Sequence, residues 1–297
     1  MSRYPNMFRA LKAREEGAFV PFVMVGDPDL AASEAVIEAL VAGGADALEL
    51  GVPFSDPVAD GPTIQRAHVR ALEAGAGFHD CLEVVARVRE RHRELPIGVL
   101  VYGNVPFALG LERFYADCAA AGVDSVLLPD VPVRESLPFS AAAQAAGVDP
   151  VHIAPPSAAD HTLDAVAAAS RGYVYAVSRV GVTGTEHASS TVGLAQAVER
   201  LRCASAAPVM LGFGISRPDQ VAEALAAGAD GAISGSAVVR IVEAHAASLR
   251  EAPRGSTAHE AELEALSSEL VGFCSAMKAA TRRSTGHSVP SVPQEQR

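Results

Sequence analysis

Lysine is almost absent from this chain of 297 residues. Only Lys12 and Lys278 occur, and both lie in helical segments near its ends. A lysine in mid-chain that could form an imine is therefore lacking. This excludes aldolases that act through a lysine Schiff base and enzymes that bind a pyridoxal cofactor through lysine. Tryptophan is also absent, and aromatic residues make up only 5% of the chain.

Paired cysteines and long apolar runs are missing as well. Cys81, Cys118, Cys203 and Cys274 are far apart and form no CxxC pair, as expected for buried thiols in a reducing compartment. The N-terminal stretch has no apolar signal core. No uninterrupted apolar run approaches the length of about 18 residues that a spanning helix needs. We expect a soluble, cytoplasmic protein.

Basic residues are outnumbered, with a formal net charge of −11 and a pI of about 5.3. This excess of acid argues against a general nucleic-acid binder, which would present a basic face. It does not exclude an anionic substrate, because a local pocket can oppose the global sign. The nine histidines form no HxH or HExxH pattern, so we expect no metal site.

Eight short apolar runs do recur, separated by amphipathic segments that predict helices. The runs are continuous rather than alternating in polarity, which is typical of strands buried on both faces. They lie at residues 19–25, 46–50, 97–103, 124–130, 149–154, 172–178, 208–214 and 230–235. Eight strand–helix units in a chain of this length predict an α/β fold, a single (β/α)8 TIM barrel. A doubly wound open sheet is the alternative, although no GxGxxG motif follows the first run.

A Gly-x-Asp pattern precedes four of these runs. Gly44, Gly122, Gly147 and Gly228 suit the left-handed position just past the end of a helix. The aspartate two residues later is expected to cap the short turn into the next strand. We assign these turns to the structural face of the barrel, opposite the active site.

Further segments flank the barrel. Residues 3–15 predict an extra N-terminal helix, and residues 258–280 predict a C-terminal helix with Thr257 in a capping box. We predict one catalytic barrel domain at 1–280. Residues 281–297 are polar and rich in proline and serine, so we expect a disordered tail.

Two carboxylates fall where a barrel enzyme carries its reacting groups, at and beyond the end of a strand. Glu49 would face the barrel interior if Leu48 and Leu50 face the helices. A glutamate paired with an arginine is the alternative, but no arginine lies in the neighbouring runs. An unpaired buried carboxyl has a raised pKa, which suits proton transfer near neutrality. Asp60 is either a second such group or the N-cap of a helix that begins near Pro62.

Glycine-rich loops follow the sixth, seventh and eighth runs. Glycines allow backbone amides to approach an anion, and a helix N-terminus favours negative charge. Phosphate sites in this fold commonly use the loops after strands seven and eight. The alternative is that these glycines only make tight turns. Aromatic and aliphatic residues near the strand ends would line an apolar pocket or simply fill the barrel core; they are Phe22, Leu100, Tyr102, Leu127, Ile153 and Tyr175.

Long segments of the chain resemble the tryptophan synthase α subunit family. They include "PFVMVGDPD", "ALELGVPFSDPVADGPTIQ", "LLPDVPVRES", "SRVGVTGTE", "GFGIS" and "GAISGSA", in the family's order. The resemblance runs from about residue 4 to 250 and again from 268 to 280. It implies a (β/α)8 barrel that cleaves indole-3-glycerol phosphate to indole and glyceraldehyde 3-phosphate without a metal or organic cofactor.

The resemblance also implies roles for single residues. Glu49 would be the general acid/base, and Asp60 would accept a hydrogen bond from the indole N–H, arriving with its loop as substrate binds. Substrate would be held by the apolar residues named above, and Thr183 would contact Asp60 from a mobile loop. The phosphate would bind at Gly184, Gly214, Gly235 and Ser236.

A partner is implied too, the β subunit of an α2β2 complex, docked at Asp56, Pro57 and Pro132. Three other hypotheses stay open from the sequence. The chain could be a stand-alone lyase that releases indole, a catalytically idle barrel that activates a partner, or another phosphate-sugar enzyme on the same barrel. The presence of both Glu49 and Asp60 favours the lyase.

Overall fold

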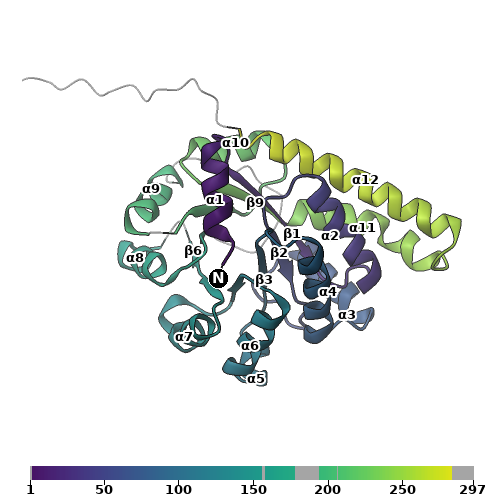
Figure 1. Cartoon of the computed structure of the whole chain (residues 1–297), viewed down its shortest axis with the longest axis horizontal. Coiled ribbons are helices and arrows are strands. Elements are labelled where there is room, and N and C mark those ends of the chain that lie inside the picture. The colour runs from purple at the N-terminus through teal and green to yellow at the C-terminus, as the bar shows by residue number, and fades with distance from the viewer. Residues whose placement is uncertain (1, 156–157, 178–193, 206, 283–297) are drawn as a thin grey trace, which may run out of the picture.

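The computed structural model describes residues 2–155, 158–177, 194–205 and 207–282. Within these residues, parallel strands form one sheet at the centre of a ring of helices (Figure 1). The strands are β1 (Ala18–Met24), β2 (Leu48–Gly51), β3 (Ile97–Leu100), β4 (Ser125–Leu127), β5 (Asp149–Val151), β6 (Ile153–Ala154), β7 (Val174–Val177), β8 (Val209–Gly212) and β9 (Gly231–Ser234). No helix in the described part of the chain is both long enough and apolar enough to cross a membrane.

The fifth predicted strand is broken at His152 into β5 and β6, so nine strands stand for eight barrel positions. β5 pairs with β4, and β6 pairs with β7, at the two ends of the strand order. The break falls where the chain exchanges one neighbour for the other, and the His152 carbonyl already accepts the Tyr175 N–H. The chain at 149–154 thus closes the sheet. The predicted barrel is confirmed, and the open sheet is wrong.

Helices cover the outside of the barrel, and the extra helix predicted at each end is present. Figure 1 shows α12 running along the outside, where it packs against α2 and α11. The helices are α1 (Tyr4–Ala13), α2 (Leu30–Ala42), α3 (Pro62–Glu73), α4 (Phe78–Arg91), α5 (Asn104–Leu109), α6 (Leu111–Ala121), α7 (Leu137–Ala145), α8 (Asp160–Ala169), α9 (Leu194–Ala204), α10 (Pro218–Ala226), α11 (Ser236–Glu251) and α12 (Thr257–Ala279), with a short 3-10 turn at Val133–Glu135.

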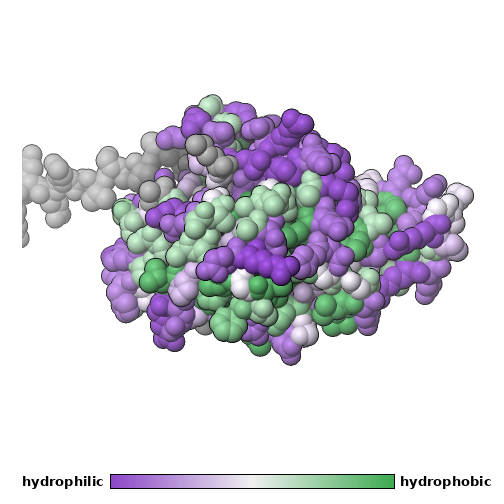
Figure 2. All heavy atoms as spheres, turned by 60° about the horizontal axis from the view of Figure 1, so that its bottom comes forward, coloured by the Kyte–Doolittle hydropathy of each residue, from purple (hydrophilic) through white to green (hydrophobic). Residues whose placement is uncertain are grey.

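The flank of α5–α7 comes forward in Figure 2, where broad apolar areas lie between polar ones. Cys203 was expected to be buried, but it lies exposed on α9, whereas the other three cysteines are buried.

Two predicted boundaries near the C-terminus were wrong by one or two residues. The N-cap of α12 is Ser256 rather than Thr257, since its hydroxyl accepts the His259 N–H. The predicted tail begins too early, because Thr281 is fully buried and Arg282 forms a backbone bridge with Glu16. The rest of that tail lies outside the described residues.

The Gly-x-Asp turns lie at the N-terminal rim of the barrel. All four glycines have positive φ, between 76° and 96°, as predicted. Three of the aspartates bond to a neighbouring strand. Asp46, Asp124 and Asp230 each accept a backbone N–H near the start of the preceding strand, from Phe19, Ile97 and Val209 respectively. Each aspartate thus ties two neighbouring strands together at the rim.

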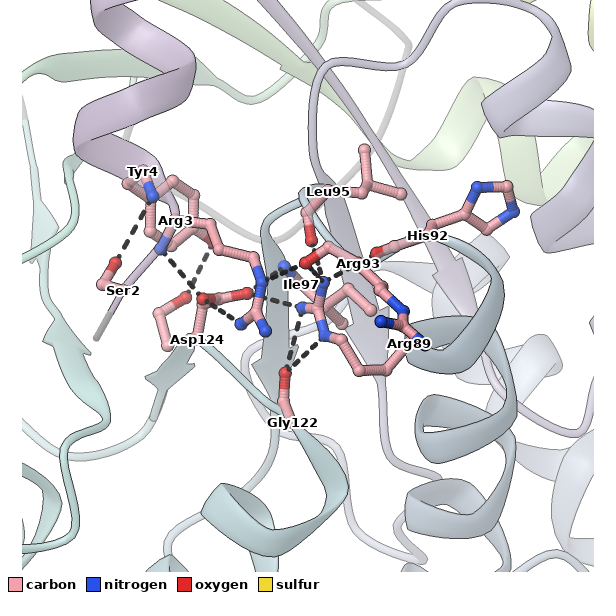
Figure 3. Close-up of polar contacts among 11 residues, drawn as sticks. Ser2, Arg3, Tyr4, Arg89, His92, Arg93, Leu95, Ile97, Gly122 and Asp124 are labelled. Carbon is pink, nitrogen blue, oxygen red and sulfur yellow. Dashed lines mark hydrogen bonds and ion pairs between the residues drawn. The ribbon is translucent and has the colours of Figure 1, made fainter.

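Asp124 also anchors the N-terminal helix, as Figure 3 shows. Arg3 donates its backbone N–H and Nη1 to Oδ1, both at 3.0 Å. Arg89 donates Nη2 to Oδ2 at 2.7 Å. Next to this cluster, the Tyr4 hydroxyl lies 2.9 Å from Ser125 Oγ. The start of α1 therefore closes the bottom of the barrel with a buried ring and a buried, fully bonded carboxylate.

We predict that Asp124→Ala lowers the free energy of unfolding by about 3–5 kcal/mol, because it leaves two partly buried guanidinium groups without their counter-charge and the buried Ile97 N–H without its acceptor. Urea unfolding followed by circular dichroism measures this. The control is Asp164→Ala, which breaks a solvent-exposed pair with Arg200 on the outer surface and should change stability little. Equal effects of the two variants would contradict a structural role for the Asp124 cluster.

Candidate active site

A cavity opens at the C-terminal ends of the strands, on the face opposite the Asp124 cluster. Its wall is built from strand ends and from the loops and helix starts that follow them. The lining residues are Phe22, Glu49, Asp60, Ile64, Leu100, Tyr175, Phe213, Gly214, Ile215, Gly235 and Ser236. Two carboxylates, an apolar surface and a glycine-rich rim therefore meet in one place.

Glu49 lies in β2 between Phe22 of β1 and Gly98 of β3. Leu48 and Leu50 pack in the outer core, so Glu49 points into the barrel, as predicted. Its carboxyl is 2% exposed, and this burial is the main reason that its pKa rises from 4.5 to about 7. A hydrogen bond from Tyr173 opposes the rise, and the charge of Asp60 adds to it. Near neutrality both protonation states of Glu49 are therefore populated.

Tyr173 holds Glu49 and was not found from the sequence. Its hydroxyl donates to Oε1 at 2.9 Å. Its ring meets the ring of Tyr4 edge to face, with centroids 5.4 Å apart. The alternation of side chains along a strand could have indicated Tyr173, because it lies two residues before Tyr175 and so faces the same side. The helix that closes the barrel bottom thus packs against the residue that orients Glu49.

Asp60 lines the same cavity and is 7% exposed. Its Oδ2 accepts a hydrogen bond from the Tyr102 hydroxyl at 2.8 Å and lies 3.1 Å from His68 Nε2. Two side chains thus fix it at the cavity wall, rather than leaving it on a free loop. The N-cap of α3 is Gly61, so the capping alternative for Asp60 is wrong. His68 was missed, although a histidine on the buried face of α3 was a visible signal.

Three residues that were predicted to line the pocket are not among those that line the described cavity. Tyr102 reaches Asp60 through its hydroxyl and is not part of the described cavity wall. Leu127 and Ile153 pack with Tyr4 and Tyr173 in the interior of the barrel, where they pair in register with Leu100 and Tyr175 of the cavity wall. Thr183 and Gly184 lie outside the described residues.

The glycine-rich rim lies at the ends of β8 and β9. Phe213 and Gly214 both have positive φ, 84° and 79°, in the turn after β8. Gly235 precedes α11, and Ser236 is its first residue. The first turn of α11 therefore opens on the cavity, where its unpaired amides and dipole favour an anion.

Comparison with known proteins agrees with this geometry. A family model described as "Tryptophan synthase alpha chain" matches residues 8–268. The chain belongs to the tryptophan synthase alpha chain family. The curated tryptophan synthase alpha chain of Corynebacterium diphtheriae is 56% identical over 282 residues, covering 95% of this chain and 100% of that one. That of Corynebacterium glutamicum is 55% identical over 283 residues, with the same coverage.

Solved structures give the same result. The chain resembles the structure of Mycobacterium tuberculosis tryptophan synthase, with a TM-score of 0.80, 32% identity and coverage of 95% of this chain and 99% of that one. It also resembles tryptophan synthase subunit alpha from Legionella pneumophila, with a TM-score of 0.80, 29% identity and coverage of 95% and 98%. The tryptophan synthase alpha reaction is a lyase reaction of tryptophan biosynthesis, the cleavage of indole-3-glycerol phosphate to indole and glyceraldehyde 3-phosphate.

Gly212 makes room for Tyr175 in the cavity of this family member. A Cβ atom at position 212 would lie 2.2 Å from the Tyr175 hydroxyl oxygen. We predict that Gly212→Ala forces Tyr175 out of place and lowers kcat/KM for indole release by about tenfold or more, as expected for a crowded, well-packed site. Gly272→Ala on α12, where a Cβ meets nothing within 4 Å, is the control. Activity of Gly212→Ala equal to that of the control would contradict the crowding.

Proposed function

We propose that Glu49 and Asp60 carry out this cleavage by general acid/base catalysis. The observation that supports the proposal most is Glu49 itself, a carboxyl buried in the barrel with a pKa near 7 that shares one cavity with Asp60. A catalytic acid/base works best when its pKa lies near the operating pH. An isolated structural carboxylate would instead be paired with a cation, and the partner that the structure gives Glu49 is a tyrosine.

The reaction needs one proton to be given and one to be taken. Protonated Glu49 adds its proton to the indole carbon that bears the glycerol phosphate, and the ring becomes a positively charged indolenine. Asp60 accepts the indole N–H and stabilises that charge. Glu49, now ionised, assists removal of the proton from the adjacent hydroxyl. The carbon–carbon bond breaks, its electrons return to the ring, and indole and the aldehyde separate.

The rest of the cavity suits the two ends of the substrate. Phe22 and Leu100 offer apolar surface to the indole ring, together with Ile64, which the sequence did not indicate. Gly214, Gly235 and Ser236 offer backbone amides, a hydroxyl and the start of α11 to the phosphate. Thr183 and Gly184 complete the site in this proposal.

A docking face for the β subunit is proposed on the loops after β2, β3 and β4. These loops touch one another, since the Ala59 N–H donates to the Tyr102 hydroxyl and the Gly103 N–H donates to Asp130. Asp56, Pro57 and Pro132 lie on them. Large apolar side chains nearby are strongly exposed; they are Val58 (74%), Phe107 (76%) and Leu137 (76%). Such exposure favours a partner subunit over the stand-alone lyase. We place the reaction in the cytoplasm.

The decisive experiment measures indole release from indole-3-glycerol phosphate, with the chain alone and with a β subunit added. Glu49→Gln should lower kcat by about 10²–10⁴-fold, the usual contribution of a positioned acid/base. Glu83→Gln changes an exposed glutamate on α4 in the same way and serves as the control. Near-wild-type activity of Glu49→Gln would refute the mechanism. No indole from the wild type in either condition would favour the idle barrel.

A further inference from the structure

His68 is a buried side chain with two polar contacts and no place in the reaction proposed above. It is 1% exposed on the inner face of α3. The Phe54 backbone N–H donates to its Nδ1 at 2.9 Å, and its Nε2 lies 3.1 Å from Asp60 Oδ2. Both contacts go to the loop between β2 and α3, one near its start and one near its end.

These contacts determine which ring nitrogen carries the proton. A backbone N–H can only donate, so Nδ1 must accept and carries no hydrogen. A neutral imidazole then has its hydrogen on Nε2, which donates to Asp60. The contact is therefore a hydrogen bond from a neutral ring to the carboxylate, and the Phe54 amide selects the tautomer that makes it.

Tyr102 supplies a second donor to the same oxygen of Asp60, at 2.8 Å. Its ring stacks on Phe54, with centroids 5.1 Å apart, and meets His68 edge to face at 6.1 Å. The Ala59 N–H donates to its hydroxyl. With both donors directed at Oδ2, the carboxylate of Asp60 has a defined orientation, and Oδ1 is the oxygen that would meet the substrate.

We propose that His68 is a positioning residue for the lyase reaction, holding Asp60 through its Nε2–H in the orientation that accepts the indole N–H. The inference rests on the proposed role of Asp60. Because the bond from the indole nitrogen to Asp60 strengthens as the ring becomes positive, loss of the orientation lowers kcat more than it raises KM.

A matched pair of variants isolates this hydrogen bond. His68→Gln places an amide N–H near the position of Nε2, whereas His68→Met has similar length and no donor. Both lose the Nδ1 acceptor, so any effect through Phe54 is common to the pair. We expect kcat for indole release to be about tenfold or more lower in His68→Met than in His68→Gln, as for loss of one hydrogen bond to a charged group, with a smaller difference in KM.

The same pair in an Asp60→Ala background provides the test that a purely structural role would not pass. With the acceptor removed, the ratio of the two kcat values should fall to about one. Equal kcat values in the original background, or an undiminished ratio without Asp60, would overturn the role of His68. If Asp60→Ala itself keeps wild-type kcat, the proposed function of Asp60 is refuted. This result can be told apart from the two that refute only the role of His68.

Should either His68 variant fail to fold, Tyr102→Phe provides a second measurement, because it removes the other donor to Oδ2. In the protein that keeps Asp60, Tyr102→Phe should lower kcat. In the double variant with Asp60→Ala, kcat should equal that of Asp60→Ala alone. An equal loss from Tyr102→Phe with and without Asp60 would show that packing, rather than orientation of the carboxylate, is what this cluster supplies.

Discussion

The structure depends on one constraint, a carboxyl group that stays buried inside the barrel with no cation beside it among the described residues. Burial makes the charged form of Glu49 costly and raises its pKa, while the Tyr173 hydroxyl keeps the ionised form accessible. An arginine in place of the tyrosine would hold the carboxylate ionised and would remove its ability to donate a proton. Tyr173 therefore affects the pKa of Glu49 and is also part of the barrel core.

The carboxylates at the two ends of the barrel have different hydrogen-bond partners. At the N-terminal end, ionised side chains are paired and bonded, with Asp124 between Arg3 and Arg89 as the clearest case. At the C-terminal end, Glu49 and Asp60 receive only neutral donors from the described residues, namely Tyr173, Tyr102 and His68. Carboxylates with neutral donors keep the freedom to take up a proton or to accept a bond from a substrate. The aspartates at the N-terminal end tie neighbouring strands together, and these same strands carry the cavity residues at their other ends.

Much of the fold could be predicted from the sequence because the strands are buried on both faces and read as apolar runs. The inward direction of Glu49 followed from the alternation within β2. The break at His152 could not be predicted, because it depends on where the chain exchanges pairing partners. The aspartates of the Gly-x-Asp turns were expected to cap those turns. Three of them instead accept a hydrogen bond from a backbone N–H of the neighbouring strand, which is distant in sequence.

The site was predicted less completely than the fold, for a related reason. Tyr173 and His68 act through hydrogen bonds to residues 124 and 8 positions away, and periodicity reports only that they face inward. Leu127 and Ile153 were expected in the pocket because they lie near strand ends, and the register between strands puts them level with Leu100 and Tyr175 of the cavity wall. The family resemblance named Glu49 and Asp60, and both line the cavity, but the contacts that hold them came only from the structure.

Direct titration of the Glu49 carboxyl tests the central claim. Carbon-13 NMR of protein labelled at the glutamate side chains would follow it, with the signal assigned from Glu49→Gln. The account predicts a midpoint near pH 7, and a higher midpoint in Tyr173→Phe, since the hydrogen bond that lowers the pKa is lost. A midpoint near the ordinary value of 4.5 in the wild-type protein would contradict it, because Glu49 would then lack the proton with which the reaction begins.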